Sequence, residues 1–169
     1  MPLSTRAKRF LKESNAIEDV FDEDSFHQAI YAWEYLIAQD ELTTSVILKT
    51  HKILMLHQPL MPNEKGYWRT VPVFVGGREA KPYHAVPELM RQWTLNANDL
   101  TANYRTKDPS RFLSGLTKLH HINFEKVHPF VDGNGRIGRM LLNWQRIKLG
   151  LPILIIKNSE KQKYYEWFN

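Results

Sequence analysis

The 169-residue sequence contains no cysteine, which excludes disulfide bonds, cysteine zinc sites and thiol nucleophiles. It has no apolar run of the roughly 18 to 20 residues that a membrane-spanning helix needs, and its start, MPLSTRAKRFLKES, lacks the apolar segment of a signal peptide. With 43% hydrophobic and 12% aromatic residues, a chain of this length is expected to form one domain around a sizeable core. We therefore expect a soluble, cytoplasmic protein without membrane contact.

Hydrophobic residues recur at helical spacing over most of the chain, and capping residues and prolines mark the expected helix ends. The pattern predicts helices at 25–39, at 43–57, from Asp108 and Pro109 to about Val127, and at about 135–149. Gly76 and Gly77 separate two short segments, 70–75 and 81–86, which predicts a β-hairpin at the edge of a helical body. The expected fold class is therefore mainly α, a helical bundle with a small hairpin.

The segment HPFVDGNGRIGR, which begins at His128, combines a histidine, a carboxylate, a Gly-Asn-Gly turn and two arginines. The proline after His128 stops the preceding helix, so this histidine is expected at a helix exit, where it is a candidate general base. Gly133 and Gly135 flank Asn134 and would let backbone N–H groups converge on an anion at the start of the next helix.

Arg136 and Arg139 are three residues apart on that next helix and therefore share one face. Like charges repel there unless something negative lies between them, so a polyphosphate or a carboxylate from elsewhere in the chain would satisfy both. Asp132, just before the turn, is placed to hold a magnesium ion against phosphates. Phe130 is assigned to the core, and we do not expect His120 and His121 to bind a metal, because they lack a matching ligand spacing.

This segment resembles the signature of the Fic family, His-x-Phe-x-Asp/Glu-Gly-Asn-Gly-Arg-x-x-Arg, at every fixed position. The stretch GYWRTVPVFVGG at 66–77, with 81–86, is similar to the flap hairpin of that family, so the resemblance covers nearly all of the chain. It implies a Fic-type helical bundle and a protein adenylyltransferase, which moves AMP from ATP to a hydroxyl side chain of an unknown target protein, with ATP as substrate and Mg²⁺ as cofactor.

The resemblance also implies a role for each signature residue. His128 would be the catalytic base, Asp132 would bind the metal, and the nucleotide would be held by Gly133, Asn134, Gly135, Arg136 and Arg139. A target segment would pair with the edge of the flap, at about 70–86, through Val73, Phe74, Val75, Gly76 and Gly77. Tyr164 and Tyr165 would either line an adenine pocket or pack against the helices.

An acidic stretch near the start of the chain resembles the inhibitory helix of some Fic proteins, which has the pattern Ser/Thr-x-x-x-Glu-Gly/Asn. Ser14 and Glu18 match this pattern, and Asp19 stands where glycine or asparagine is usual. The resemblance implies that Glu18 pairs with Arg139 and displaces the γ-phosphate. Residues 1–24 would thus be an inhibitory segment and residues 25–169 the Fic core, together in a single domain.

Two alternatives remain open at this point. Residues 111–169 carry 10 lysines and arginines against 4 acidic residues, and a basic region of this kind also suits a nucleic-acid-binding module. We do not expect that function, since the arginines belong to a phosphate-type loop. Within the family, transfer of another phosphate-containing group or removal of AMP is the nearer alternative, and homo-oligomer formation stays possible.

Overall fold

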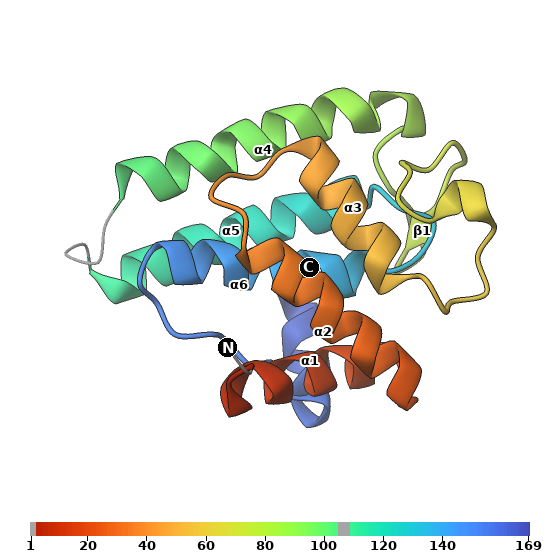
Figure 1. The fold of residues 1–169 in the computed structure, drawn as a ribbon. Coiled ribbons are helices and arrows are strands. Elements are labelled where there is room, and N and C mark those ends of the chain that lie inside the picture. Colours follow the sequence, from red (N-terminus) through yellow and green to blue (C-terminus); the bar gives the residue numbers. More distant parts are fainter. Residues whose placement is uncertain (1–2, 105–108) are drawn as a thin grey trace.

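The computed structural model describes residues 3–104 and 109–169, which are built mainly from helices (Figure 1). The α-helices are α1 (Thr5–Ile17), α2 (Glu23–Ile37), α3 (Thr44–Leu54), α4 (Val86–Asn103), α5 (Ser110–Val127), α6 (Asn134–Lys148) and α7 (Lys161–Tyr165). Strands β1 (Phe74–Val75) and β2 (Arg78–Glu79) form an antiparallel pair. The expected fold class is confirmed. None of the helices in these residues combines the length and apolar character that a bilayer span requires.

Side-chain caps fix the starts of the first three helices. Ser4, Asp22 and Thr43 each accept a hydrogen bond from the backbone N–H three residues later, at 2.8 to 3.2 Å. Such caps satisfy backbone donors that have no partner inside the helix. Helices α1, α2 and α3 therefore begin where the local sequence directs them to begin.

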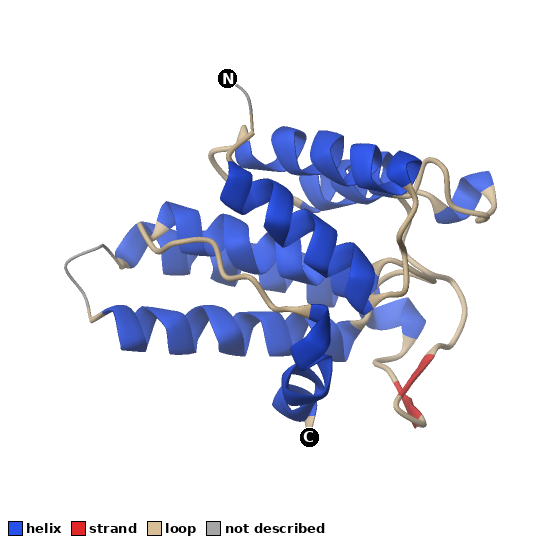
Figure 2. Ribbon diagram, turned by 90° about the horizontal axis from the view of Figure 1, so that it is seen from below, coloured by secondary structure: helices blue, strands red, loops and turns tan. Residues whose placement is uncertain are grey.

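Helix α6 is the centre of the bundle and contacts α1, α2, α3, α4 and α5. Apolar residues such as Ile137, Leu141 and Trp144 are buried along its length. Its first turn carries the arginines of the signature, which are therefore enclosed by protein. The hairpin, in contrast, projects from one end of the helical body (Figure 2).

The helices expected at 25–39, 43–57 and 135–149 are present as α2, α3 and α6, with their ends shifted by one to three residues. The helix expected to end at about Val127 is α5, and it begins just after Pro109. Asp108, which the sequence suggests as part of its cap, lies outside the described residues.

The turn of the hairpin is also present where it is expected. Gly76 and Gly77 connect the two strands with φ angles of 55° and 78°, and Phe74 lies opposite Glu79 in the ladder. Positive φ at both central residues is what the tight turn of a two-residue hairpin requires. The strands are only two residues long.

The second strand expected at 81–86 is wrong. Residues Tyr83–Ala85 form a 3₁₀ turn that leads directly into α4, a helix that the sequence patterns above do not include. Pro82 and Pro87 have no N–H to donate to a strand ladder. Pro87 instead lies in the first turn of α4, where a missing N–H is tolerated and the fixed φ of proline suits a helix.

Candidate active site

His128 lies where α5 ends. It is the C-cap residue, with a left-handed φ of 49°, and its N–H donates to the carbonyl of Phe124 at 3.0 Å. Pro129 cannot continue the helix. A left-handed backbone is uncommon for a residue with a Cβ and is often found at functional sites. The side chain is 21% exposed, so this helix exit presents part of an imidazole to the surroundings.

The side chain of Asn134 shapes the loop between α5 and α6. Its Oδ1 accepts from the N–H of Phe130 and its Nδ2 donates to the carbonyl of Phe130, both at 2.9 Å. Asn134 is 3% exposed. Its amide is therefore used inside the loop, and its backbone is the part left to contact a ligand. Phe130 is fully buried, which confirms its expected place in the core.

His51 from α3 lies against this loop and carries no sequence signal of its own. Its Nδ1 accepts from the N–H of Gly66 and its Nε2 donates to the carbonyl of Asp132, both at 2.9 Å. The ring stacks on Phe130, with centroids 3.7 Å apart. The two hydrogen bonds together require a neutral imidazole with its proton on Nε2.

This arrangement predicts a pH-dependent stability. Burial lowers the pKa of His51 from 6.5 to about 4. Between these values the unfolded chain binds a proton here that the folded chain does not, so the contribution of neutral His51 to stability is complete above pH 6.5 and is lost as the pH falls toward 4. We expect the free energy of unfolding in urea to fall by about 2 kcal/mol from this residue between pH 7 and pH 5.

Two glutamine substitutions separate this effect from general acid sensitivity. His51→Gln removes the titrating ring, so the free energy of unfolding of this variant should fall less than that of the wild type between pH 7 and pH 5. His57 is exposed just beyond the same helix, so His57→Gln should retain the wild-type dependence. If His51→Gln and the wild type lose stability equally on acidification, His51 is not the buried neutral base described here.

Asp132 lies at the open side of the loop, with its side chain 58% exposed. Its Oδ1 accepts from the N–H of Gly133 at 2.6 Å, and its Oδ2 lies 3.9 Å from Nη2 of Arg136. Gly133 is the N-cap of α6, with a φ of 84°. Within the described residues there is no group of three or more histidines and acidic residues that would enclose a metal ion. A metal here would thus depend on one carboxylate together with ligands from a substrate.

Arg136 is 2% exposed and has few partners. Its Nη2 contacts the sulfur of Met55 at 3.4 Å, while its Nε and Nη1 are buried without a hydrogen-bond partner. Burial lowers the pKa of this guanidinium, but arginine stays protonated in proteins. Unsatisfied buried donors are rare because they are costly. The site therefore offers a positive charge and free N–H groups to an anion.

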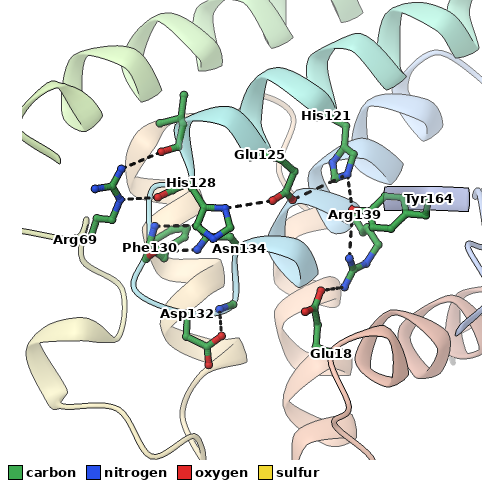
Figure 3. A network of polar contacts seen from close by, with 12 residues as sticks. Glu18, Arg69, His121, Glu125, His128, Phe130, Asp132, Asn134, Arg139 and Tyr164 are labelled. Atoms are coloured by element: carbon green, nitrogen blue, oxygen red, sulfur yellow. Dashed lines mark hydrogen bonds and ion pairs between the residues drawn. The ribbon is translucent and has the colours of Figure 1, made fainter. Parts of the chain in front are cut away.

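Arg139, on the same face of α6, is surrounded by partners. Its Nη2 donates to Oε1 of Glu18 at 2.7 Å (Figure 3). Nη2 also donates to the carbonyl of Ser14, and Nε donates to Oγ of Ser14, both at 2.9 Å. Its Nη1 lies 3.3 Å from the hydroxyl of Tyr164. The structure thus brings Ser14 and Glu18 onto the second arginine of the signature.

Glu18 also lies against the first turn of α6, because a Cβ added at Gly135 would overlap its carboxylate. The next residue, Asp19, has a φ of 56°. Glycine and asparagine adopt this conformation readily, and aspartate is among the few other residues that tolerate it. Asp19 therefore keeps the turn that the usual glycine or asparagine would make.

Arg69 connects the flap to the end of α5. Its guanidinium donates to the carbonyls of His128 at 2.7 Å, of Val71 at 2.9 Å and of Lys81, and its own N–H donates to the carbonyl of Pro129 at 2.9 Å. Arg69 is 3% exposed. One buried side chain therefore holds both ends of the flap beside His128.

The residues expected to dock a target lie on the outer part of the flap. Phe74 is 69% and Val75 is 43% exposed, Gly76 and Gly77 form the exposed turn, and Val73 accepts a backbone hydrogen bond from Ala80 at 2.9 Å. This hairpin presents apolar side chains and a short strand edge to the surroundings.

The two tyrosines near the end of the chain differ in burial. Tyr164 is 3% exposed and its hydroxyl lies 2.8 Å from Nε2 of His121; burial raises the pKa of this tyrosine above its usual value. Tyr165 is 40% exposed. Tyr164 thus packs inside the protein, and Tyr165 is the one with a face available to a ligand.

Figure 3 shows the predicted residues in two groups along the first turns of α6. His128, Asp132 and Asn134 lie on one side, and Glu18 and Arg139 lie on the other. The expected docking residues belong to the hairpin that projects from one end of the helical body (Figure 2). His51 and Arg69, which support the loop and the flap, come from outside the signature. Arg69 lies within the stretch at 66–77 that resembles the flap of the family, whereas His51 belongs to no motif.

Comparison with known families and proteins gives a consistent set of similarities. The sequence model of the Fic/DOC family matches residues 41–145. The protein adenylyltransferase Fic of Drosophila erecta is 31% identical over 134 residues, which is 78% of this chain and 25% of that protein. The Drosophila melanogaster protein of the same name is 30% identical over 132 residues, also 78% and 25%. The chain thus spans about a quarter of the length of these curated relatives.

Solved structures show the same fold at low sequence identity. A Fic domain containing signaling protein from Bacteroides thetaiotaomicron has a TM-score of 0.77 and 20% identity, over 95% of this chain and 69% of that one. Fic-1 from C. elegans has a TM-score of 0.70 and 21% identity, over 98% and 58%.

Proposed function

This chain belongs to the Fic/DOC family, and from that premise we propose that it transfers AMP from ATP to a hydroxyl side chain of a target protein. The name of its Drosophila relatives, protein adenylyltransferase Fic, supports this reaction. The observation that carries the proposal is the buried guanidinium of Arg136, whose Nε and Nη1 have no hydrogen-bond partner. A phosphate group is the ligand that such a buried cation with free donors fits.

The triphosphate would bind at the N-terminus of α6. Arg136 supplies charge there, and the backbone N–H groups at Gly133, Asn134 and Gly135 add donors at the positive end of the helix. Arg139 would take the γ-phosphate when Glu18 is absent from it. The adenine of ATP would extend toward Tyr165, whose exposed ring can stack on it.

The residues present also fit a magnesium ion. Mg²⁺ is usually bound by one or two carboxylates together with substrate phosphates and water. Asp132 offers one exposed carboxylate, whose Oδ2 lies 3.9 Å from Nη2 of Arg136. When bound, the ion would neutralise charge on the α- and β-phosphates. Asp132 is thus the residue that would hold it, and the backbone N–H of Gly133 orients that carboxylate.

His128 would act as the general base. Its imidazole accepts the proton of the target hydroxyl while the hydroxyl oxygen forms a bond to the α-phosphorus, and the bond to the bridging oxygen of pyrophosphate breaks. A target segment would pair with the edge of the flap, and Arg69 would keep that edge in place beside His128. Backbone pairing specifies little of the target sequence, so the flap would position the hydroxyl and not select the protein.

Residues 1–24 would restrain this reaction. Glu18 places its carboxylate on Arg139 and against Gly135, which is the space a γ-phosphate would need. ATP could then bind productively after α1 moves or after Glu18 is removed. Residues 25–169 would be the catalytic core, within one domain that includes α1.

Mass spectrometry tests the proposed reaction. A cell lysate is incubated with ATP, magnesium and either the wild-type chain or Glu18→Gly. We expect AMP adducts on serine, threonine or tyrosine of one or more proteins, including this chain itself, with more adducts for Glu18→Gly. Phosphate adducts alone would instead indicate a kinase-type reaction, and the absence of adducts with either chain would refute the proposal.

The metal assignment makes a separate prediction. Asp132→Asn keeps an acceptor for the Gly133 N–H but removes the charge, and Asp132→Ala removes both. In calorimetry on the Glu18→Gly background, each should weaken magnesium-dependent ATP binding at least about tenfold, which is roughly 1.4 kcal/mol, and lower transfer in parallel. The exposed Asp99 provides a control for loss of one negative charge. Magnesium-dependent binding that is intact in Asp132→Asn would show that another group holds the ion.

A further inference from the structure

A polar cluster extends from His128 through Glu125 to His121 and Tyr164 (Figure 3). Glu125 lies three residues before His128 on α5, and its side chain is 11% exposed. Its Oε2 is 3.6 Å from Nδ1 of His128, and its Oε1 is 4.0 Å from Nε2 of His121. Glu125 Oε1 makes no hydrogen bond and is buried. This carboxylate has therefore been placed in the interior beside two imidazoles.

The imidazole of His128 faces this carboxylate with its inner nitrogen. Nδ1 is buried and has no hydrogen-bond partner, although the whole side chain is 21% exposed. The exposed part of the ring is therefore the edge away from Nδ1. A separation of 3.6 Å is longer than a hydrogen bond, but such contacts are often long before substrate binds and shorten in the complex. Oε2 of Glu125 is thus a negatively charged acceptor within 4 Å of this otherwise unsatisfied nitrogen.

The packing around Glu125 leaves room for this contact. A Cβ at Gly138 on α6 would overlap the Glu125 carboxylate and would also lie 2.9 Å from Cε1 of His121. Glycine at this variable position of the signature thus lets α6 approach α5 with a carboxylate between them. A buried acidic group that merely filled space would be expensive, so its placement calls for a role.

The groups that face Glu125 keep it negatively charged. Burial alone would raise the pKa of its carboxyl, but the neighbouring His128 and the positive charge of Arg139 outweigh this, and the pKa lies below its usual value. His121 is buried, which lowers its pKa to about 4, so this ring is neutral near pH 7. Tyr164, which bonds to His121, is neutral as well. The charged partner available to His128 from this side is thus Glu125.

We propose that Glu125 is a positioning residue for His128: its carboxylate accepts a hydrogen bond from Nδ1–H, which fixes the ring and leaves Nε2 as the basic atom that faces the target hydroxyl. This inference rests on the proposed adenylyl transfer for its kinetic consequence. Nε2 takes the proton from the hydroxyl, and the imidazolium that forms is stabilised by the carboxylate behind it. A carboxylate that orients a catalytic histidine in this way sets its tautomer as well as its direction.

Nitrogen NMR of the histidine rings tests the tautomer without any enzymatic assay. The chain is labelled with ¹⁵N-histidine, and the His128 signals are assigned by their loss in His128→Ala. At neutral pH we expect wild-type His128 to carry its proton on Nδ1, and Glu125→Gln to lose this preference. Lys126→Gln, which changes an exposed charge at the next position, should match the wild type. A proton on Nε2 of wild-type His128 would overturn the inference.

Kinetics on the Glu18→Gly background provide a second readout. Glu125→Gln should lower kcat for AMP transfer about fivefold with KM for ATP within twofold of the parent, because the carboxylate does not touch the nucleotide. Glu125→Asp retains the charge and should transfer AMP faster than Glu125→Gln. It provides the test if Glu125→Gln folds poorly. Unchanged kcat in Glu125→Gln would count against the inference. The proposed adenylyl transfer would still hold if His128→Ala is inactive. The two proposals are therefore tested by different variants.

Discussion

His128→Ala, in the Glu18→Gly background, is expected to lower AMP transfer by about 10² to 10⁴, the usual contribution of a general base. The imidazole is the basic group at the exit of α5, next to the loop that would hold the phosphates. Removing it takes away the group that we propose accepts the proton of the attacking hydroxyl. The buried Arg136 and the N-terminus of α6 are unchanged by this substitution, so ATP affinity should stay within about twofold.

Transfer is measured with radiolabelled ATP, and affinity is measured by calorimetry on the same preparation. Asn134 offers a contrast, because its side chain is bound to Phe130 and its loss should disturb the loop, affinity and transfer together. His128→Ala with normal transfer would remove the base from the mechanism. His128→Ala with lost affinity as well would show that the residue supports the loop and not the proton transfer.

Glu18→Gly is expected to raise AMP transfer, or self-modification, at least about tenfold, which corresponds to roughly 1.4 kcal/mol of relieved competition. Glu18 accepts a hydrogen bond from Arg139 at 2.7 Å and lies against Gly135, where the γ-phosphate would bind. Once the carboxylate is gone, Arg139 still has Ser14 and Tyr164 as partners. The fold should therefore persist, while Nη2 of Arg139 becomes available to phosphate.

Two matched variants make this result specific. Asp19→Gly alters the neighbouring left-handed residue but keeps the carboxylate of Glu18, so its transfer rate should equal that of the wild type. Arg139→Ala also breaks the pair with Glu18, but it removes the proposed phosphate ligand and should not activate. Equal rates for the wild type and Glu18→Gly at saturating magnesium would mean that α1 has only a structural role.

Much of the fold could be predicted because its signals are local. The cap Thr43 and the sequence Val127-His128-Pro129 determine helix ends through hydrogen bonds and backbone restrictions within a few residues. The cap of α2 is Asp22, three residues before the expected start at Ser25. The turn at Gly76–Gly77 follows in the same way from positive φ angles. The region 81–86 was misassigned because its conformation depends on Arg69, which binds the carbonyl of Lys81 from twelve residues away, and on the start of α4.

The active-site loop was predictable to a similar extent. The signature places His128, Asp132 and Arg136 within nine residues, so their proximity follows from the chain itself. His51 contacts Asp132 across 81 residues of sequence and Ser14 contacts Arg139 across 125. Composition and periodicity cannot show such contacts. The pairing of Ser14 and Glu18 with Arg139 was expected from a family resemblance, whereas His51 had no such pattern to mark it.

The most direct test of adenylyl transfer uses ATP radiolabelled on either its α- or its γ-phosphate. Glu18→Gly is incubated with magnesium and each form of ATP, and protein-bound label is measured, with Glu18→Gly/His128→Ala as the inactive control. Our account predicts that the α-label is retained on protein hydroxyls, the γ-label is not, and the control retains neither. Protein-bound γ-label, or equal α-label in the control, would contradict it.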